Sequence, residues 1–283
     1  MRTFISALAT VLGILLASVA VPAMWVDRNI IQEDGFVRLA APLGKNADFQ
    51  KKLAAAAVGT IDTGSVPGAL SGLVDSVLEK AAESLTQLPG YPAAWEETLR
   101  RSHRLSFASP AGESSGNAPA SSLTLDVAPL VALGSDEISR ATRLPLNPPE
   151  QTLINVGQPA HREWAERLAT YAPVGYIAAI GSGIAFLLAL VAARRRWTVL
   201  FAAGIGGLAL AGLWSLGVQL GSARAVTTDT GNAVANMFRD QFVGAAAADF
   251  QSWIAGTAVT GGVLVAVGIV TLFASRKRVR ASR

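Results

Sequence analysis

The sequence predicts an integral membrane protein, mainly α-helical, with four transmembrane helices and a mostly helical (α+β) extracytoplasmic domain with a small β patch. Two apolar runs, residues 171–193 and 197–220, can each cross a hydrocarbon core of roughly 30 Å. Three consecutive arginines separate them, which predicts a transmembrane hairpin over 171–220 with a tight cytoplasmic turn. Apolar runs also lie near both chain ends, whereas residues 25–170 have an ordinary soluble composition.

Composition narrows the possible functions. Only 16% of the 283 residues are charged, against about a quarter in soluble domains. The net charge of +4 is uneven, because residues 25–170 carry 13 Lys/Arg against 17 Asp/Glu. The basic excess lies at the membrane edges and predicts no nucleic-acid binding. Cysteine is absent, which excludes disulfides, thiolate zinc sites and cysteine nucleophiles.

The first membrane helix is predicted over residues 1–24. Ser18-Val19-Ala20 resembles a signal-peptidase site, so a cleaved signal peptide is the alternative. We favour an uncleaved anchor because the apolar run continues beyond that site to Trp25, which would lie in the interfacial belt. Either way, the following segment is exported.

The exported segment 25–170 begins with three predicted helices. Asn46 or Asp48 caps the first helix, which ends at residues 62–64. A second, amphipathic helix runs from there to a break at 88–92 that contains proline and glycine. A third helix follows over residues 93–107. A domain of this size can fold on a hydrophobic core alone.

The rest of the exported segment contains the β patch. Residues 109–122 are polar and of low complexity, which predicts a surface loop. Residues 123–127 alternate apolar and polar side chains as a strand does, and 152–156 form a second strand that can pair with them. Between the strands we expect a short apolar helix or turn at 128–133 and a short polar helix at 136–142.

Beyond this domain, a helix from Gln158 is expected to continue directly into the second membrane helix. After the hairpin, residues 221–253 are a predicted extracytoplasmic connector helix. This helix either packs on the domain or lies on the outer leaflet as an amphipathic helix. The fourth membrane helix is predicted over 254–274 and a basic cytoplasmic tail over 275–283.

Basic residues predict the orientation in the cell membrane. Cytoplasmic loops of membrane proteins are enriched in lysine and arginine. Both termini are therefore expected in the cytoplasm and residues 25–170 outside it, in a multi-pass protein of the plasma membrane. The topology determinants are Arg194, Arg195, Arg196, Arg276, Lys277 and Arg278.

A series of short motifs resembles a known family. They are Asp34-Gly35-Phe36-Val37 with Ala41-Pro42-Leu43, the spacing Trp95-x4-Arg100-x2-His103, residues 123–129, and Thr152-Leu153-Ile154. In this order the chain resembles uncharacterised actinobacterial four-helix integral membrane proteins. The resemblance implies a turn before the Ala-Pro-Leu stretch and an extracytoplasmic domain between the first and second membrane helices. It implies no established activity, and residues 109–122 and 157–161 depart from its pattern.

Trp95, Arg100 and His103 are the candidate binding residues. On a helix Arg100 and His103 are neighbours, and Trp95 lies about 80° around the axis from His103. A guanidinium, an imidazole and an indole could bind an anionic group with an aromatic or apolar part. The structural alternative is that Trp95 lies in the core, Arg100 pairs with a carboxylate, and His103 bonds to the backbone.

The sequence indicates neither a metal site nor a nucleophilic catalytic motif. A metal site would need His103 together with His161 and a carboxylate such as Glu163 or Glu166. The chain has only two histidines, far apart in sequence, so we predict no metal and no cofactor. No Gly-x-Ser-x-Gly motif predicts a nucleophile.

The last three membrane runs contain no Asp, Glu, Lys, Arg or His. Ion-coupled transporters generally place such groups inside the membrane, so transport is not favoured. Ala203, Gly207 and Ala211 recur at four-residue spacing, which predicts close helix packing.

Two function classes follow. We favour a non-enzymatic, membrane-anchored extracytoplasmic interaction or scaffold protein of the actinobacterial cell envelope, with the lipid bilayer and another membrane or envelope protein as partners. The alternative is an exported sensor, ligand-binding or envelope-enzyme domain with a site near Trp95, Arg100 and His103. Whether these three side chains face a cleft or the core discriminates between the two classes.

Overall fold

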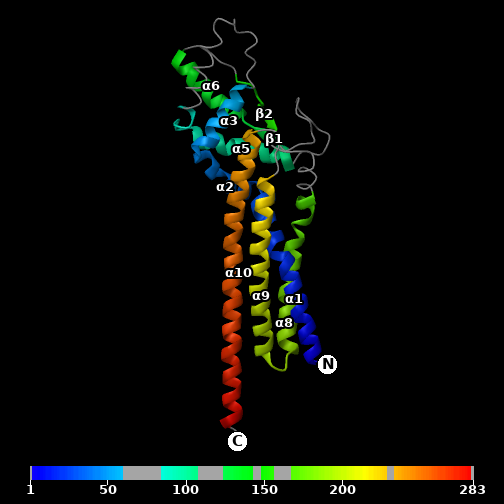
Figure 1. The fold of residues 1–283 in the computed structure, drawn as a ribbon. Coiled ribbons are helices and arrows are strands. Elements are labelled where there is room, and N and C mark those ends of the chain that lie inside the picture. Colours follow the sequence, from blue (N-terminus) through cyan, green and yellow to red (C-terminus); the bar gives the residue numbers. More distant parts are fainter. Residues whose placement is uncertain are drawn as a thin grey trace. The chain divides into compact units, whose positions relative to one another are not determined.

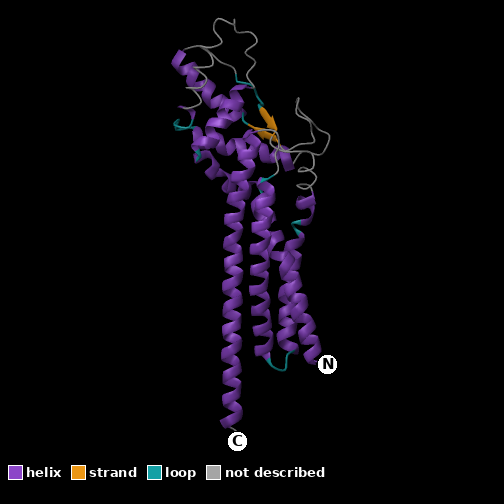
Figure 2. Cartoon of the chain, in the orientation of Figure 1, coloured by secondary structure: helices purple, strands orange, loops and turns teal. Residues whose placement is uncertain are grey.

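The computed structural model describes residues 2–59, 84–107, 124–142, 148–155, 167–227 and 233–281. The chain forms two compact units. The membrane unit comprises Met1–Asp27, Thr170–Ala223 and Ala246–Arg283, and the helical domain comprises Arg28–Ala169 and Arg224–Ala245. Figures 1 and 2 show that helix dominates the described part of the chain. The predicted ranges that fall in residues 60–83, 108–123, 143–147, 156–166 and 228–232 lie outside the described residues.

The membrane unit is built on four helices. They are α1 (Arg2–Val26), α8 (Val174–Ala192), α9 (Arg196–Val226) and α10 (Ala233–Ala281). Each is long and apolar enough to cross a membrane, as the sequence predicts. The large apolar side chains that are exposed in the described residues all lie on these spans. Soluble proteins rarely expose apolar patches of this extent, so the chain is a multi-pass membrane protein.

Serine hydroxyls and small residues join α1 to α8. Ser6 Oγ donates a hydrogen bond to the Ala189 carbonyl oxygen (2.9 Å), and Ser182 Oγ donates one to the Gly13 carbonyl oxygen (2.9 Å). The contact partners on α8 move from Ala189 back to Ser182 as α1 advances from Ser6 to Gly13. The two helices are therefore antiparallel. Gly13 faces the Phe186 ring so closely that an added Cβ would lie 3.0 Å from it. Small residues therefore set the distance between these helices.

Glycines bring α9 against α10. A Cβ on Gly204 would lie 2.6 Å from the Gly261 carbonyl oxygen, and one on Gly268 would lie 3.1 Å from the Phe201 nitrogen. Of the predicted packing residues, Gly207 also faces Gly261, Ala211 is buried, and Ala203 is half-buried. The closest approach of α9 to α10 is at Gly204. Gly204 is next to Ala203 but is not one of the residues at four-residue spacing.

One end of the membrane unit is aromatic. Trp25 Nε1 donates a 2.7 Å hydrogen bond to Asp249 Oδ1, and the Phe250 ring packs against both Trp25 and Trp214. Tyr176 Oη donates a 3.1 Å hydrogen bond to Asp27 Oδ2. At the other end lie the N-terminus, the turn between α8 and α9, and the end of α10 (Figure 1). Aromatic residues at one end and arginines at the other are typical of the two membrane–water interfaces.

Two predicted boundaries in this unit do not coincide with helix ends. The connector 221–253 and the span 254–274 are not separate helices, because α10 is continuous from Ala233 to Ala281. This stretch has no proline and is rich in alanine, so nothing interrupts the helix. The second membrane helix is not continuous with the preceding turn of helix, since the chain breaks at Ala172 and Pro173 before α8 begins.

The helical domain contains short helices and one pair of strands. After the π-helical turn η1 (Asp27–Ile31) come α2 (Glu33–Ala40), the 3₁₀ turn η2 (Ala41–Lys45), α3 (Ala47–Gly59), α5 (Tyr91–Phe107) and α6 (Ala128–Thr142). Strand β1 (Thr124–Asp126) pairs antiparallel with β2 (Leu153–Asn155), with Leu125 opposite Ile154. Buried apolar side chains from α3, α5 and both strands form the core. Its most buried large members are Trp95, Phe49, Leu53, Leu99, Leu125 and Val127.

Local chemistry explains the start of this domain. Asn46 Oδ1 accepts a hydrogen bond from the Phe49 nitrogen (3.0 Å), so Asn46 rather than Asp48 caps α3. Residues 34–37 are not the turn that the resemblance implies, because they lie within helix α2. A Cβ on Gly35 would collide with the Arg28 carbonyl oxygen, so glycine is needed where α2 passes η1. Residues 128–142 form one helix rather than two short elements.

The glycine contact between α9 and α10 gives a first prediction. Gly204→Leu should destabilise the protein by about 1–3 kcal/mol, because the new side chain meets α10 backbone. Gly217→Leu is the matched control on the same helix, where an added Cβ meets nothing within 4 Å. Thermal unfolding of the detergent-solubilised full-length protein measures the difference. Equal unfolding midpoints for the two variants would contradict the packing described above.

Candidate functional site

Helix α5 carries all three candidate residues. Its acidic Glu96 and Glu97 lie before the basic Arg100, Arg101 and Arg104, an order that matches the helix dipole. Glu97 and Arg101 also form a 3.0 Å ion pair one turn apart. Local charge order therefore supports this helix, while its apolar face enters the domain core.

Trp95 belongs to the core. Its side chain is 2% exposed and packs edge-on against Phe49, with the ring centroids 5.7 Å apart. Gly44 of η2 lies directly over the indole, since an added Cβ would be 2.5 Å from Trp95 Cδ1. The indole nitrogen is buried and has no hydrogen-bond partner among the residues that the structure describes. The absence of a side chain at Gly44 is what lets the turn close over this ring.

Arg100 is held by carboxylates of α2. Its Nη1 lies 2.9 Å from Asp34 Oδ1 and 3.1 Å from Glu33 Oε1, and Arg104 lies 3.5 Å from the other Glu33 oxygen. Hydrogen bonds to Asp34 and then to Glu33 raise the pKa of Arg100. The two carboxylates are in the first turn of α2, where the helix dipole favours negative charge. Arg100 thus fastens α5 to the start of α2.

His103 is bonded to the backbone of η1. The side chain is buried, and its Nε2 lies 3.1 Å from the Ile30 carbonyl oxygen. Because a carbonyl only accepts, Nε2 carries the hydrogen. The imidazole stacks on Phe107 at 4.6 Å and packs against Phe36 at 5.1 Å. Burial lowers the pKa of His103, so the ring is neutral at pH 7.

The three side chains therefore do not form one binding patch. Trp95 faces η2 and Phe49, Arg100 faces the start of α2, and His103 faces η1 and two phenylalanines. Each makes the kind of contact that the structural alternative describes. Trp95 and Arg100 line a cavity in this domain, and His103 is not among its lining residues.

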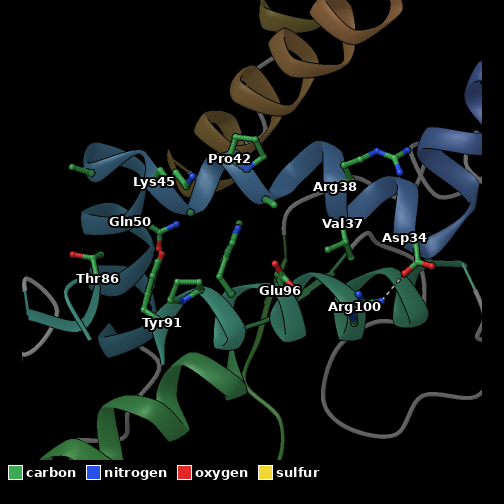
Figure 3. A pocket seen from close by; sticks show the side chains of 15 residues that line it. Asp34, Val37, Arg38, Pro42, Lys45, Gln50, Thr86, Tyr91, Glu96 and Arg100 are labelled. Carbon is green, nitrogen blue, oxygen red and sulfur yellow. Dashed lines mark hydrogen bonds and ion pairs between the residues drawn. The ribbon is translucent and has the colours of Figure 1, made fainter. Parts of the chain in front are cut away.

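That cavity has a volume of about 920 Å³ and lies between α5 and the segment α2–η2–α3 (Figure 3). Arg38 on its wall bonds to Asn29 Oδ1 at 3.2 Å. In the part of the chain that the structure describes, Lys45 and Glu96 have no ion-pair partner, although both line the cavity. The Tyr91 hydroxyl is buried without a hydrogen-bond partner in the described ranges, and its burial raises the pKa of Tyr91. None of these three residues stood out from sequence alone.

Asp126 is a structural residue that the sequence analysis did not single out. Its Oδ1 accepts hydrogen bonds from the Ala128 and Thr152 nitrogens, both at 3.1 Å. Its own backbone nitrogen donates to Ser102 Oγ at 2.9 Å. One carboxylate thus caps α6 and holds the second strand segment near the first. The signal in the sequence is an aspartate shortly before the helix-starting proline Pro129.

The predicted metal alternative is not tested by the structure. His161, Glu163 and Glu166 lie outside the described residues, and His103 is bonded to backbone. Within the described ranges no group of three histidine, aspartate or glutamate side chains could hold a metal ion.

No protein-family model, curated protein or solved structure matches this chain. The resemblance to actinobacterial four-helix membrane proteins therefore rests on its motifs alone and stays a prediction. The fold and the apolar spans define the class: a multi-pass, mainly helical membrane protein.

The burial of Trp95 gives a second prediction. Trp95→Ala should cost about 3–5 kcal/mol, a large share of the stability of an ordinary domain. Glu96→Ala, at the exposed neighbouring position, should change stability by less than about 0.5 kcal/mol. Chemical denaturation of the full-length protein in detergent compares the two. If Trp95→Ala is as stable as Glu96→Ala, the indole is not a core residue.

The environment of His103 predicts a pH dependence. The folded protein holds a neutral imidazole with a lowered pKa, whereas the unfolded chain binds a proton near pH 6.5. Stability should therefore fall as the pH drops below about 6.5. His103→Gln cannot titrate and should weaken this slope. Unfolding midpoints between pH 7.5 and 5.5 measure it, and identical slopes in both proteins would refute the assignment.

Proposed function

We propose that the protein is a non-enzymatic, membrane-anchored interaction or scaffold protein of the cell envelope. The observation that carries this proposal is the use of all three candidate side chains inside the domain. Trp95 fills the core, Arg100 pairs with Asp34 and Glu33, and His103 bonds to the Ile30 carbonyl. Contacts of this kind stabilise a fold, which supports a structural role for the three side chains.

Support also comes from the membrane spans. The core regions of α8 and α9, and α10 between Ile254 and Ala274, carry no ionisable side chain that could relay ions or protons. Three of their hydroxyl groups, those of Ser182, Thr257 and Thr260, donate to helix carbonyls. Such helices suit an anchor or a contact with another membrane protein.

The proposed topology places the helical domain outside the cytoplasm and both termini inside. It rests on the arginines between α8 and α9 and on the basic end of α10. The proposed partners are the bilayer and another membrane or envelope protein.

Cysteine labelling tests this topology, because the chain has no native cysteine. Ala93→Cys on α5 and Arg195→Cys in the turn between α8 and α9 both introduce exposed thiols. We expect a membrane-impermeant maleimide to label Ala93→Cys in intact cells and Arg195→Cys only after lysis. The reverse pattern would overturn the orientation, and labelling of both in intact cells would do the same.

Complementation of a knockout strain tests the function. His103→Gln and Arg100→Gln should accumulate and complement, because each removes contacts of modest energy from an otherwise intact domain. Trp95→Ala should fail through loss of folded protein. Stable but inactive His103→Gln or Arg100→Gln protein would contradict the scaffold proposal.

A second candidate function, binding of a small ligand by the helical domain, is favoured by one observation. Lys45 and Glu96 line the 920 Å³ cavity with opposite charges and no ion-pair partner among the described residues. The double variant Lys45→Met with Glu96→Gln distinguishes this function in the same complementation assay. Loss of complementation with normal protein levels would favour a ligand site over a scaffold.

A further inference from the structure

The membrane unit contains a second cavity, of about 750 Å³. All four membrane helices contribute to its wall, for example Ile14 of α1, Phe186 of α8, Gly207 of α9 and Gly256 of α10. Every lining residue lies within a membrane span. The cavity is therefore a half-open space in the bundle, at the depth of the apolar spans.

Packing of the helices in pairs explains why this space is left open. Backbones of α1 and α8 approach closely at Gly13 and Ser182, and those of α9 and α10 approach at Gly204 and Gly261. Between the two pairs the wall has glycine where a side chain could have filled the gap. A Cβ on Gly256 would meet nothing within 4 Å.

The cavity wall offers no charged group and no unpaired hydroxyl group to an occupant. No charged residue lines the cavity, and its three hydroxyl groups donate to carbonyls of their own helix. Ser252 donates to Asp249 at 2.6 Å, Thr257 to Trp253 at 2.9 Å, and Thr260 to Gly256 at 2.8 Å. Water in a buried site needs two to four polar partners, so this space suits an apolar occupant.

The dimensions match a lipid chain. Along α10 the lining residues extend from Ser252 to Leu264, about 18 Å at the rise of a helix. One leaflet of the hydrocarbon core is roughly 15 Å thick, half of a typical bilayer core. Trp214, Trp253 and Ser252 line the cavity near the aromatic end of the unit, where Asp249 bonds to Trp25. Tryptophan at that level is typical of the interface that holds lipid headgroups.

We propose that this cavity binds one acyl chain of a membrane phospholipid, with its headgroup at the Ser252 and Trp253 end. The lipid completes the packing between the α1–α8 pair and the α9–α10 pair. This inference goes beyond the proposed scaffold function and does not depend on it.

Filling the cavity provides the test. Gly256→Leu adds a side chain at the cavity wall, and nothing lies within 4 Å of its Cβ. Gly262→Leu on the same helix is the matched control, with equally open surroundings and no place in the cavity wall. Ala203→Leu fills the cavity from α9 and serves as an independent second variant.

Full-length proteins are purified in mild detergent, and bound phospholipid is measured by native mass spectrometry and lipid extraction. Wild type and Gly262→Leu should retain stoichiometric phospholipid, whereas Gly256→Leu and Ala203→Leu should retain several-fold less. Added phospholipid should raise the unfolding midpoint of delipidated wild type and leave that of Gly256→Leu unchanged, which separates lipid loss from misfolding. Equal lipid content in all four proteins, or none in wild type, would overturn the proposal. So would a cavity variant that keeps its lipid but changes the oligomeric state by light scattering, since a helix of a second copy would then occupy the space.

Discussion

The membrane unit depends on satisfying polar groups without water while bringing helices close together. Ser6 and Ser182 meet this constraint by donating to carbonyl oxygens of the facing helix. On α10, Thr257 and Thr260 meet it by donating to their own helix. Since lipid offers no hydrogen bonds, each unpaired hydroxyl would be costly. The same constraint favours glycine and alanine at the contacts, because dispersion between closely packed backbones replaces the hydrophobic effect inside a bilayer.

In the helical domain, helix α5 has the corresponding central position. Three of its side chains attach it to consecutive elements of the preceding segment: His103 to η1, Arg100 to α2, and Trp95 to η2. On its other side, Ser102 accepts from the Asp126 nitrogen and so connects α5 to the strand pair. Helix α5 alone thus connects most elements of the domain. The spacing of Trp95, Arg100 and His103 reflects these structural contacts.

The sequence predicts the number of membrane-length helices and the helix that carries Trp95, because hydropathy and helical periodicity are local properties. Contacts between distant residues could not be predicted. Trp25 and Asp249 are 224 positions apart, and their hydrogen bond depends on the relative positions of α1 and α10 in the bundle. The continuity of α10 was missed because a change from polar to apolar composition resembles a boundary although the backbone does not break there. The positions of Lys45 and Glu96 at a cavity could not be predicted, because a single charged residue in the sequence does not indicate whether it lines a cavity.

The serine contacts between α1 and α8 have a further consequence. Buried Ser6, Gly13 and Ala20 follow one another at intervals of seven, as do Gly175, Ser182 and Ala189 on the facing helix. A seven-residue repeat keeps the same stripe in contact only if two helices wind around each other with a left-handed supercoil. The pair therefore has the seven-residue repeat of an antiparallel coiled coil, with a seam of small residues. Larger side chains should therefore be most destabilising at positions seven residues apart along α1 and α8.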